Sequence, residues 1–211
     1  MERAIFQEEH LIFRDAFIKC LEKEVVPHYE QWEKDHNVPR EAWLKMGENG
    51  FLCPWVAEEY GGAGAGFEYS VIIAEESNRK DLVGFMHSLH SSIITPYIDA
   101  YGTEEQKKRW LPGCVTGEII TAIAMTEPGA GSDLAALRTT AVKDGDHYII
   151  NGQKTFISNG LCSNLVIVAA KTDTSAGHRG ISMICVEDGT PGFSRGRRLE
   201  KMGMHAADTA E

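Results

Sequence analysis

A Pro/Gly turn that carries hydroxyl groups follows directly on a β-prone run just past the middle of the chain. The run covers residues 119–125, and the turn reads TEPGAGSD over residues 126–133. Glycines at 129 and 131 remove the Cβ atoms that would hold the main chain away from a ligand, while Thr126 and Ser132 add hydroxyl groups. The pattern predicts a loop whose backbone N–H groups face a bound molecule.

A second segment, IINGQKTFISNG, follows at residues 149–160. Together with residues 124–133 (AMTEPGAGSD), it carries a resemblance to a known family. The first stretch is similar to the flavin- and substrate-contacting signature of the acyl-CoA dehydrogenases, and the second follows at the distance at which that family has its own. The resemblance extends over essentially the whole chain, and residues 88–90, 103–107 and 201–204 most resemble the long-chain branch.

The resemblance implies an FAD-dependent enzyme that desaturates an acyl-CoA thioester between Cα and Cβ, as in fatty-acid β-oxidation. In such a reaction a base removes the α-proton, the flavin accepts the β-hydride, and hydrogen bonds polarise the thioester carbonyl. By resemblance, Thr126 offers a hydroxyl to the flavin ring, Phe156 packs beside the ring, and Ser158 stands near its N5 atom; the family often has Trp and Thr at the last two positions. The full set of expected FAD-binding residues is Ile123, Ala124, Met125, Thr126, Gly131, Ser132, Phe156, Ile157 and Ser158.

Six residues are expected, by the same resemblance, to bind the acyl-CoA substrate, with medium to long chains favoured. Ser132 would contact the pantetheine arm, and His178 and Arg179 would meet the CoA, where an Arg can pair with phosphate. Ser88, Leu89 and Ser92 would line the floor of the acyl tunnel. Solvated loop residues and small residues at a helix contact are the competing interpretations.

No catalytic residue is expected within this chain. In the family the catalytic carboxylate lies on helices beyond residue 211, and the Glu at the position of Glu127 is structural. The resemblance also implies an electron-transferring flavoprotein as partner and a homotetramer for the full-length enzyme. Two alternatives stay open: a related oxidase or monooxygenase, and a non-catalytic fragment that binds partner subunits or CoA esters.

Other motifs lead to no site. The glycines at 61–66 and 129–131 do not complete a dinucleotide-binding fingerprint. His87 and His90 have a spacing that suits a metal, but no further ligands cluster near them, which favours packed histidines and no metal.

Composition narrows the class of protein. The net charge of −10 is concentrated in the first 118 residues, which argues against nucleic acid as a partner. No apolar run approaches the roughly 20 residues that a membrane span needs. Five scattered cysteines and an N-terminus without the features of a signal or transit peptide favour a reduced, cytoplasmic protein.

The elements that must position these residues change character near residue 118. Before it, apolar spacing predicts five helices: one that ends before Pro27, one from Pro39 to Gly47, one beginning near Tyr69, one over 84–100 with a break at Pro96, and one opened by a Thr103–Gln106 capping box. After it, turns at 144–145 and 151–152 predict successive antiparallel hairpins, followed by strands at 165–170 and 180–187.

The expected fold class is therefore α+β, with a helical domain over residues 1–118 and an antiparallel β-barrel-like domain over residues 119–211. By resemblance, the second domain is incomplete at its C-terminus, and the family's C-terminal four-helix bundle is outside this chain.

Overall fold

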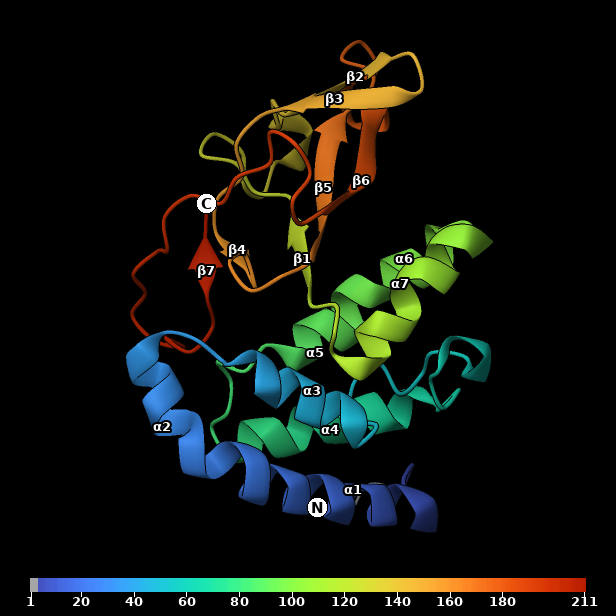
Figure 1. Ribbon diagram of the computed structural model, residues 1–211, viewed down its shortest axis with the longest axis vertical. Coiled ribbons are helices and arrows are strands. Elements are labelled where there is room, and N and C mark those ends of the chain that lie inside the picture. The colour runs from blue at the N-terminus through green and yellow to red at the C-terminus, as the bar shows by residue number, and fades with distance from the viewer. Residues whose placement is uncertain (1–3) are drawn as a thin grey trace. The chain divides into compact units, whose positions relative to one another are not determined.

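The computed structural model describes residues 4–211 and divides into two compact units (Figure 1). One unit contains the chain up to Ile120 together with Lys201–Ala207, and the other contains Thr121–Glu200 and Asp208–Glu211. The first is helical and the second is built on β-strands, so the expected α+β class is confirmed. No helix among the described residues is long and apolar enough to cross a membrane.

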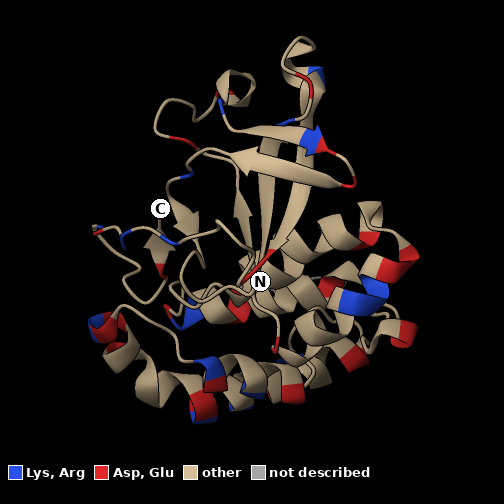
Figure 2. Cartoon of the chain, turned by 45° about the horizontal axis from the view of Figure 1, so that its top comes forward, with Lys and Arg blue, Asp and Glu red and all other residues tan. Residues whose placement is uncertain are grey.

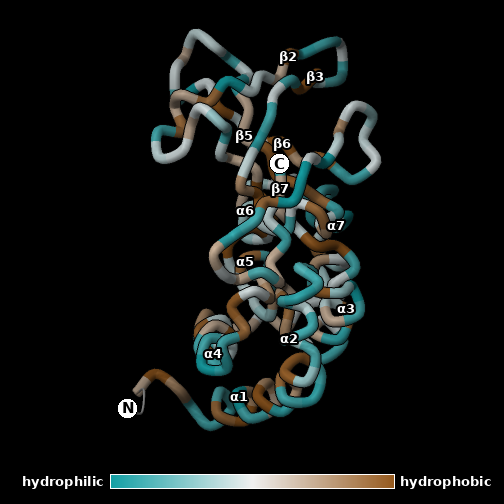
Figure 3. Tube along the Cα trace, turned by 90° about the vertical axis from the view of Figure 1, so that its left-hand side faces the viewer, coloured by the Kyte–Doolittle hydropathy of each residue, from teal (hydrophilic) through white to brown (hydrophobic). Residues whose placement is uncertain are grey.

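The described part of the helical unit, from residue 4 onward, contains ten short elements. They are α1 (Glu8–Cys20), η1 (Leu21–Val25), α2 (Val26–Asp35), α3 (Arg40–Glu48), η2 (Glu58–Tyr60), α4 (Phe67–Arg79), α5 (His87–Leu89), η3 (His90–Ile94), α6 (Thr95–Tyr101) and α7 (Glu104–Thr116). Hydrophobic and hydrophilic residues alternate along α1 (Figure 3), and Asp and Glu are spread over the helices (Figure 2). The buried side chains include Trp43, which packs edge-on against Phe85 at 5.0 Å between ring centroids.

Several of these helices were predicted correctly from short stretches of sequence. The structure confirms the helix after Pro39, the helix that contains Tyr69, and the capping box before α7. In that box Thr103 Oγ1 accepts from the N–H of Gln106 at 3.3 Å, and the N–H of Thr103 donates to Gln106 Oε1 at 2.9 Å.

The prediction that the first helix ends before Pro27 holds for α1, which ends at Cys20, but the helical run does not stop there. The chain continues through the π-turn η1 into α2, which has Pro27 in its first turn. Proline lacks an N–H, and its ring clashes with the carbonyl four residues earlier in a regular helix; the wider turn accommodates both defects. The same arrangement recurs at the predicted break, where the π-turn η3 precedes Pro96 in α6.

The segment Lys201–Ala207 belongs to the helical unit although it lies far along the chain. The carboxylate of Glu33 accepts hydrogen bonds from the N–H groups of His205, at 2.9 Å, and Ala206, at 3.1 Å. A Cβ on Gly84 would lie 2.6 Å from Glu33 Oε1 and 3.0 Å from the Cβ of Ala206, so a larger residue there would displace these side chains.

The second unit contains seven strands and two short 3-10 turns. They are β1 (Thr121–Ala124), η4 (Leu134–Ala136), β2 (Thr140–Asp144), β3 (His147–Asn151), β4 (Ile157–Ser158), β5 (Leu165–Lys171), η5 (Gly177–Gly180), β6 (Ile181–Glu187) and β7 (Thr209–Ala210). Strands β5 and β6 correspond to the two predicted later strands.

The main sheet is mixed rather than antiparallel, which corrects the expectation of a barrel-like antiparallel domain. β5 pairs in parallel with β1, from Thr121↔Leu165 onward, and antiparallel with β6 along its whole length. β2 meets the end of β5 in parallel and forms the predicted hairpin with β3. The described strands form an open five-stranded sheet and a separate β4–β7 pair, without a closed barrel.

The predicted second hairpin is also wrong, because β4 pairs with β7 and not with β3. The chain after β3 passes so close to Thr139 that a Cβ on Gly152 would lie 2.2 Å from Thr139 Oγ1. The Asn151-Gly152 pair therefore marks the end of β3, where Gly152 lies too close to Thr139 to carry a Cβ, and not a two-residue hairpin turn.

Candidate functional site

The two segments identified in the sequence lie side by side and run in opposite directions (Figure 1). At one end, Asn159 Nδ2 donates to the carbonyl oxygen of Thr121 at 3.1 Å. At the other, the N–H of Thr155 donates to the carbonyl oxygen of Thr126 at 3.0 Å. The structure thus brings together residues that are about thirty positions apart in the sequence.

A small apolar core holds the two segments against the sheet. Ala122 and Ala124 from β1 and Ile157 from β4 are buried in one cluster with two valines of β5. The side chains of Ala124 and Ile157 therefore pack inward, and only their backbone groups remain as means of contacting a cofactor.

The chemically useful groups of this pair of segments are more accessible. Thr126 and Ser158 are half-buried, and Phe156 is 67% exposed. Phe156 also has a left-handed backbone, with φ of 59°, which is rare for a bulky residue and occurs mainly where the surrounding structure imposes it. An exposed aromatic ring next to two hydroxyl groups suits a planar heteroaromatic ligand.

Lys154 connects the two segments, and sequence reasoning missed it. Its Nζ donates to the carbonyl oxygen of Met125 and to Glu127 Oε1, both at 2.9 Å. Both side chains of the ion pair are nearly buried. The signal that could have found it is the antiparallel register itself, since a chain that pairs Thr126 with Thr155 also places Glu127 opposite Lys154.

Glu127 is a structural carboxylate. It accepts from the N–H groups of Arg138, at 2.6 Å, and Thr139, at 2.9 Å, as well as from Lys154. Burial by itself raises the pKa of Glu127, but the hydrogen bonds from Thr139, Arg138 and Lys154 outweigh it and lower the pKa to about 2. The group is thus ionised and fully engaged at neutral pH, which argues against a role as base.

The residues expected to bind CoA lie on loops of the same unit. Ser132 and its neighbour Gly131 are exposed, and the 3-10 turn η4 that follows them contacts η5. His178 and Arg179 stand on η5 and are exposed as well. The fold therefore brings the loop of Ser132 and the loop of His178 and Arg179 to one place.

The three residues expected in the acyl tunnel lie in the helical unit. Ser88 and Leu89 on α5 and Ser92 on η3 are half-buried.

His87 and His90, in the same helical run, are packed histidines as expected. His87 Nε2 lies 3.0 Å from Ser77 Oγ, and His90 Nε2 lies 3.0 Å from the carbonyl oxygen of Cys114. Burial lowers the pKa of each to about 4. Among residues 4–211 no cluster of three potential metal ligands is present.

Comparisons with known proteins place both parts of the chain in one family. Residues 7–118 match the family model described as "Acyl-CoA dehydrogenase, N-terminal domain", and residues 122–211 match "Acyl-CoA dehydrogenase, middle domain". Over 211 residues the chain is 48% identical to the "Long-chain specific acyl-CoA dehydrogenase, mitochondrial" of Sus scrofa, which covers 99% of this chain and 49% of that protein.

Many solved structures are similar to this chain, among them the following two. The crystal structure of acyl-CoA dehydrogenase from Geobacillus kaustophilus is 63% identical, with a TM-score of 0.95, over 99% of this chain and 56% of that one. A glutaryl-CoA dehydrogenase from Mycobacterium smegmatis in complex with FADH2 is 30% identical, with a TM-score of 0.88, over 97% of this chain and 52% of that one. The chain spans about half the length of the relatives it matches.

Proposed function

This chain belongs to the acyl-CoA dehydrogenase family, and we propose that it forms the flavin-binding half of an FAD-dependent enzyme that desaturates acyl-CoA thioesters between Cα and Cβ. The observation that carries the proposal is the antiparallel pair of segments that presents Thr126, Phe156 and Ser158 beside one another. The relative in complex with FADH2 supports FAD as the cofactor.

The residues present fit a flavin. The accessible ring of Phe156 provides an apolar face, and the hydroxyls of Thr126 and Ser158 can hydrogen-bond ring heteroatoms. Residues 123–126, at the end of the edge strand β1 and just after it, offer backbone groups. When bound, the flavin accepts the hydride that leaves Cβ. In this proposal, Gly131 and Ser132 let the loop approach the cofactor and the pantetheine arm.

The substrate side of the proposal concerns two sets of residues. His178 and Arg179 would meet the CoA, since Arg binds phosphate through paired hydrogen bonds. Ser88, Leu89 and Ser92 would border the acyl chain, because their small or flexible side chains leave room for a medium to long one. The similarity to a long-chain specific enzyme supports this preference.

The catalytic base is proposed to come from the part of the longer relatives that this chain does not match. Glu127, the carboxylate within the motif, already accepts hydrogen bonds from three donors. We therefore propose that residues 1–211 alone lack dehydrogenase activity. The full-length protein would be a homotetramer in the cytoplasm that passes electrons to an electron-transferring flavoprotein.

The test compares residues 1–211 with the full-length protein. Both are purified and examined for flavin absorbance, for bleaching of that absorbance by acyl-CoA, and for turnover with an artificial electron acceptor. We expect a yellow, active full-length protein and a shorter chain that binds FAD weakly and shows no turnover. A colourless full-length protein would favour a non-catalytic binding module, and bleaching followed by rapid reoxidation in air would favour an oxidase.

A further inference from the structure

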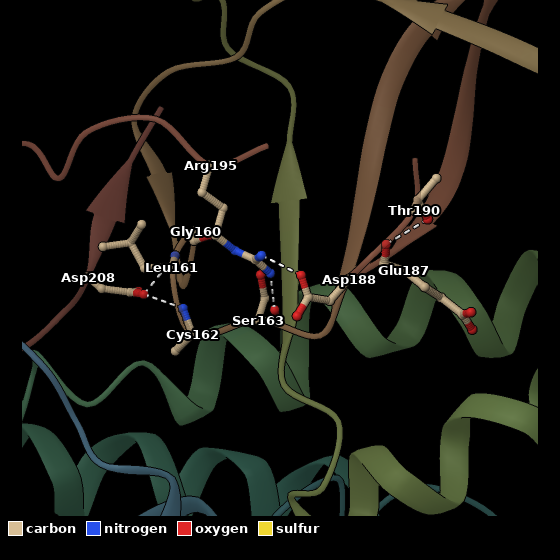
Figure 4. A network of polar contacts seen from close by, with 9 residues as sticks. All are labelled: Gly160, Leu161, Cys162, Ser163, Glu187, Asp188, Thr190, Arg195 and Asp208. Carbon is tan, nitrogen blue, oxygen red and sulfur yellow. Dashed lines mark hydrogen bonds and ion pairs between the residues drawn. The ribbon is translucent and has the colours of Figure 1, made fainter. Parts of the chain in front are cut away.

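The turn that follows Ser158 is held by two side chains from the last part of the chain (Figure 4). The guanidinium group of Arg195 donates from Nε to the carbonyl oxygen of Gly160 at 3.0 Å and from Nη2 to that of Ser163. Its third nitrogen, Nη1, pairs with Asp188. One planar group thus fixes two carbonyls of residues 160–163 and is itself anchored.

Asp208 holds the N–H groups of the same turn. Its Oδ2 accepts from Leu161 at 2.8 Å and from Cys162 at 2.6 Å. The residue is 3% exposed, and its other oxygen, Oδ1, is buried without a hydrogen-bond partner in the described structure. A buried carboxylate with one unsatisfied oxygen is destabilising by itself, so a benefit elsewhere must offset it.

Thr209 and Ala210, which follow Asp208, connect these contacts to the cofactor segment. β7 pairs with β4, with Thr209 opposite Ser158 and Ala210 opposite Ile157. Ser158 is therefore fixed from both directions, by the strand pairing beside it and by the turn that begins one residue later.

We propose that Arg195 and Asp208 are positioning residues that set the orientation of Ser158 toward the flavin ring. This inference rests on the proposed function, because it assigns Ser158 a role in contacting the flavin. Arg195 supplies the two-pronged donor that the carbonyls need, and Asp208 supplies a single acceptor for two adjacent N–H groups.

Conservative changes of Asp208 and of Arg195 should have effects of different size. In Asp208→Asn the amide oxygen can still accept from both N–H groups, and the amide nitrogen takes the place of the unpartnered oxygen. In Arg195→Lys a single ammonium group cannot reproduce the planar fork. The charge-removing change should thus be the milder one.

The experiment uses the full-length protein with its flavin and compares Asp208→Ala, Asp208→Asn, Arg195→Lys and the control Thr190→Ala. Thr190 Oγ1 donates to the carbonyl oxygen of Glu187 at 2.7 Å, so the control removes a side-chain hydrogen bond from another turn in the same unit. The readouts are the FAD dissociation constant, the visible absorbance maximum and reduction potential of the bound flavin, and the unfolding midpoint.

We expect Asp208→Ala and Arg195→Lys to raise the FAD dissociation constant by about tenfold and to shift the flavin spectrum and potential. Asp208→Asn and Thr190→Ala should keep the spectrum and potential of the wild type. If Asp208→Ala and Arg195→Lys lower the unfolding midpoint but leave the flavin spectrum and potential unchanged, the contacts of Arg195 and Asp208 are merely structural and the inference is overturned. If Asp208→Ala does not fold, Arg195→Lys against Asp208→Asn decides. A wild type that binds no flavin would overturn the proposed function, and the inference with it.

Discussion

The ammonium group of Lys154 lies 2.9 Å from the carboxylate of Glu127, and the two nearly buried side chains join the segments that carry the site. Lys154→Met should destabilise the fold by about 3 kcal/mol, because it leaves a buried carboxylate without its counter-charge. Urea unfolding at neutral pH measures the change. The matched control is Lys34→Met, since Lys34 pairs with Glu30 on an exposed helix surface and its loss should leave the unfolding midpoint unchanged.

Stability should fall as the pH drops from about 6.5 toward 4, because His87 and His90 are buried as neutral rings. Burial lowers the pKa of each to about 4, so the unfolded chain binds protons in this interval that the folded chain does not. Folding free energy from these residues is therefore present above the unfolded pKa and is lost as the pH falls toward 4. His87→Gln, which can keep a hydrogen bond to Ser77, should reduce the slope of unfolding free energy against pH. An equal slope in this variant and in the exposed control His147→Gln would contradict the prediction.

Phe156 should lower the stability of the flavin-free protein and increase its affinity for FAD. Its φ of 59° is strained for any residue with a Cβ, so Phe156→Gly should raise the free energy of unfolding of the flavin-free protein by about 1 kcal/mol and raise its unfolding midpoint. The same change removes the exposed ring, and FAD affinity should fall. Phe67 is similarly exposed but begins α4, so Phe67→Gly should not raise the midpoint. A stabilising effect of both changes would rule out backbone strain as the cause.

Replacement by alanine should have different effects at Gly131 and at Gly152. A Cβ on Gly131 would meet nothing within 4 Å, so Gly131→Ala should leave stability unchanged and weaken FAD binding if the loop approaches the cofactor as proposed. A Cβ on Gly152 would overlap Thr139, so Gly152→Ala should destabilise the fold by about 1–3 kcal/mol. Thermal unfolding and a flavin titration separate the two effects, and equal stability losses would count against the assignment.

Ser92→Trp should shift the full-length enzyme toward shorter acyl chains, because a bulky ring would occupy the space proposed for the end of a long one. The measurement is the ratio of kcat/KM for butyryl-CoA to that for palmitoyl-CoA. Ile93→Trp, at the neighbouring exposed position, is the matched control and should not change the ratio. A ratio unchanged by Ser92→Trp would remove this helix face from the acyl tunnel.

The parts of the fold that follow from short-range rules could be predicted from the sequence. The capping box at Thr103, the helix after Pro39 and the strand Leu165–Lys171 each depend on neighbouring residues only. The pairing of β4 with β7 could not be predicted in this way, because its partners are about fifty residues apart and no turn joins them. The parallel pairing of β1 with β5 was missed for the same reason.

The candidate site shows the same division. The candidate residues Thr126, Phe156 and Ser158 came from a resemblance that two short sequence segments carry. The contacts that hold them in place could not be found in this way, since Lys154, Arg195 and Asp208 are recognisable only once distant segments are known to be adjacent. Supporting residues of a site are defined by three-dimensional proximity, which a single sequence does not encode locally.

The π-turns before Pro27 and Pro96 have a further effect on the helices that contain them. Each accommodates one residue more per turn than an α-helix, and one residue corresponds to a rotation of about 100°. Residues on either side of each proline are therefore out of phase. A helical wheel drawn straight through such a proline assigns the downstream residues to the wrong side, and correct amphipathic maps of these helices must restart their angular count at Val26 and at Thr95.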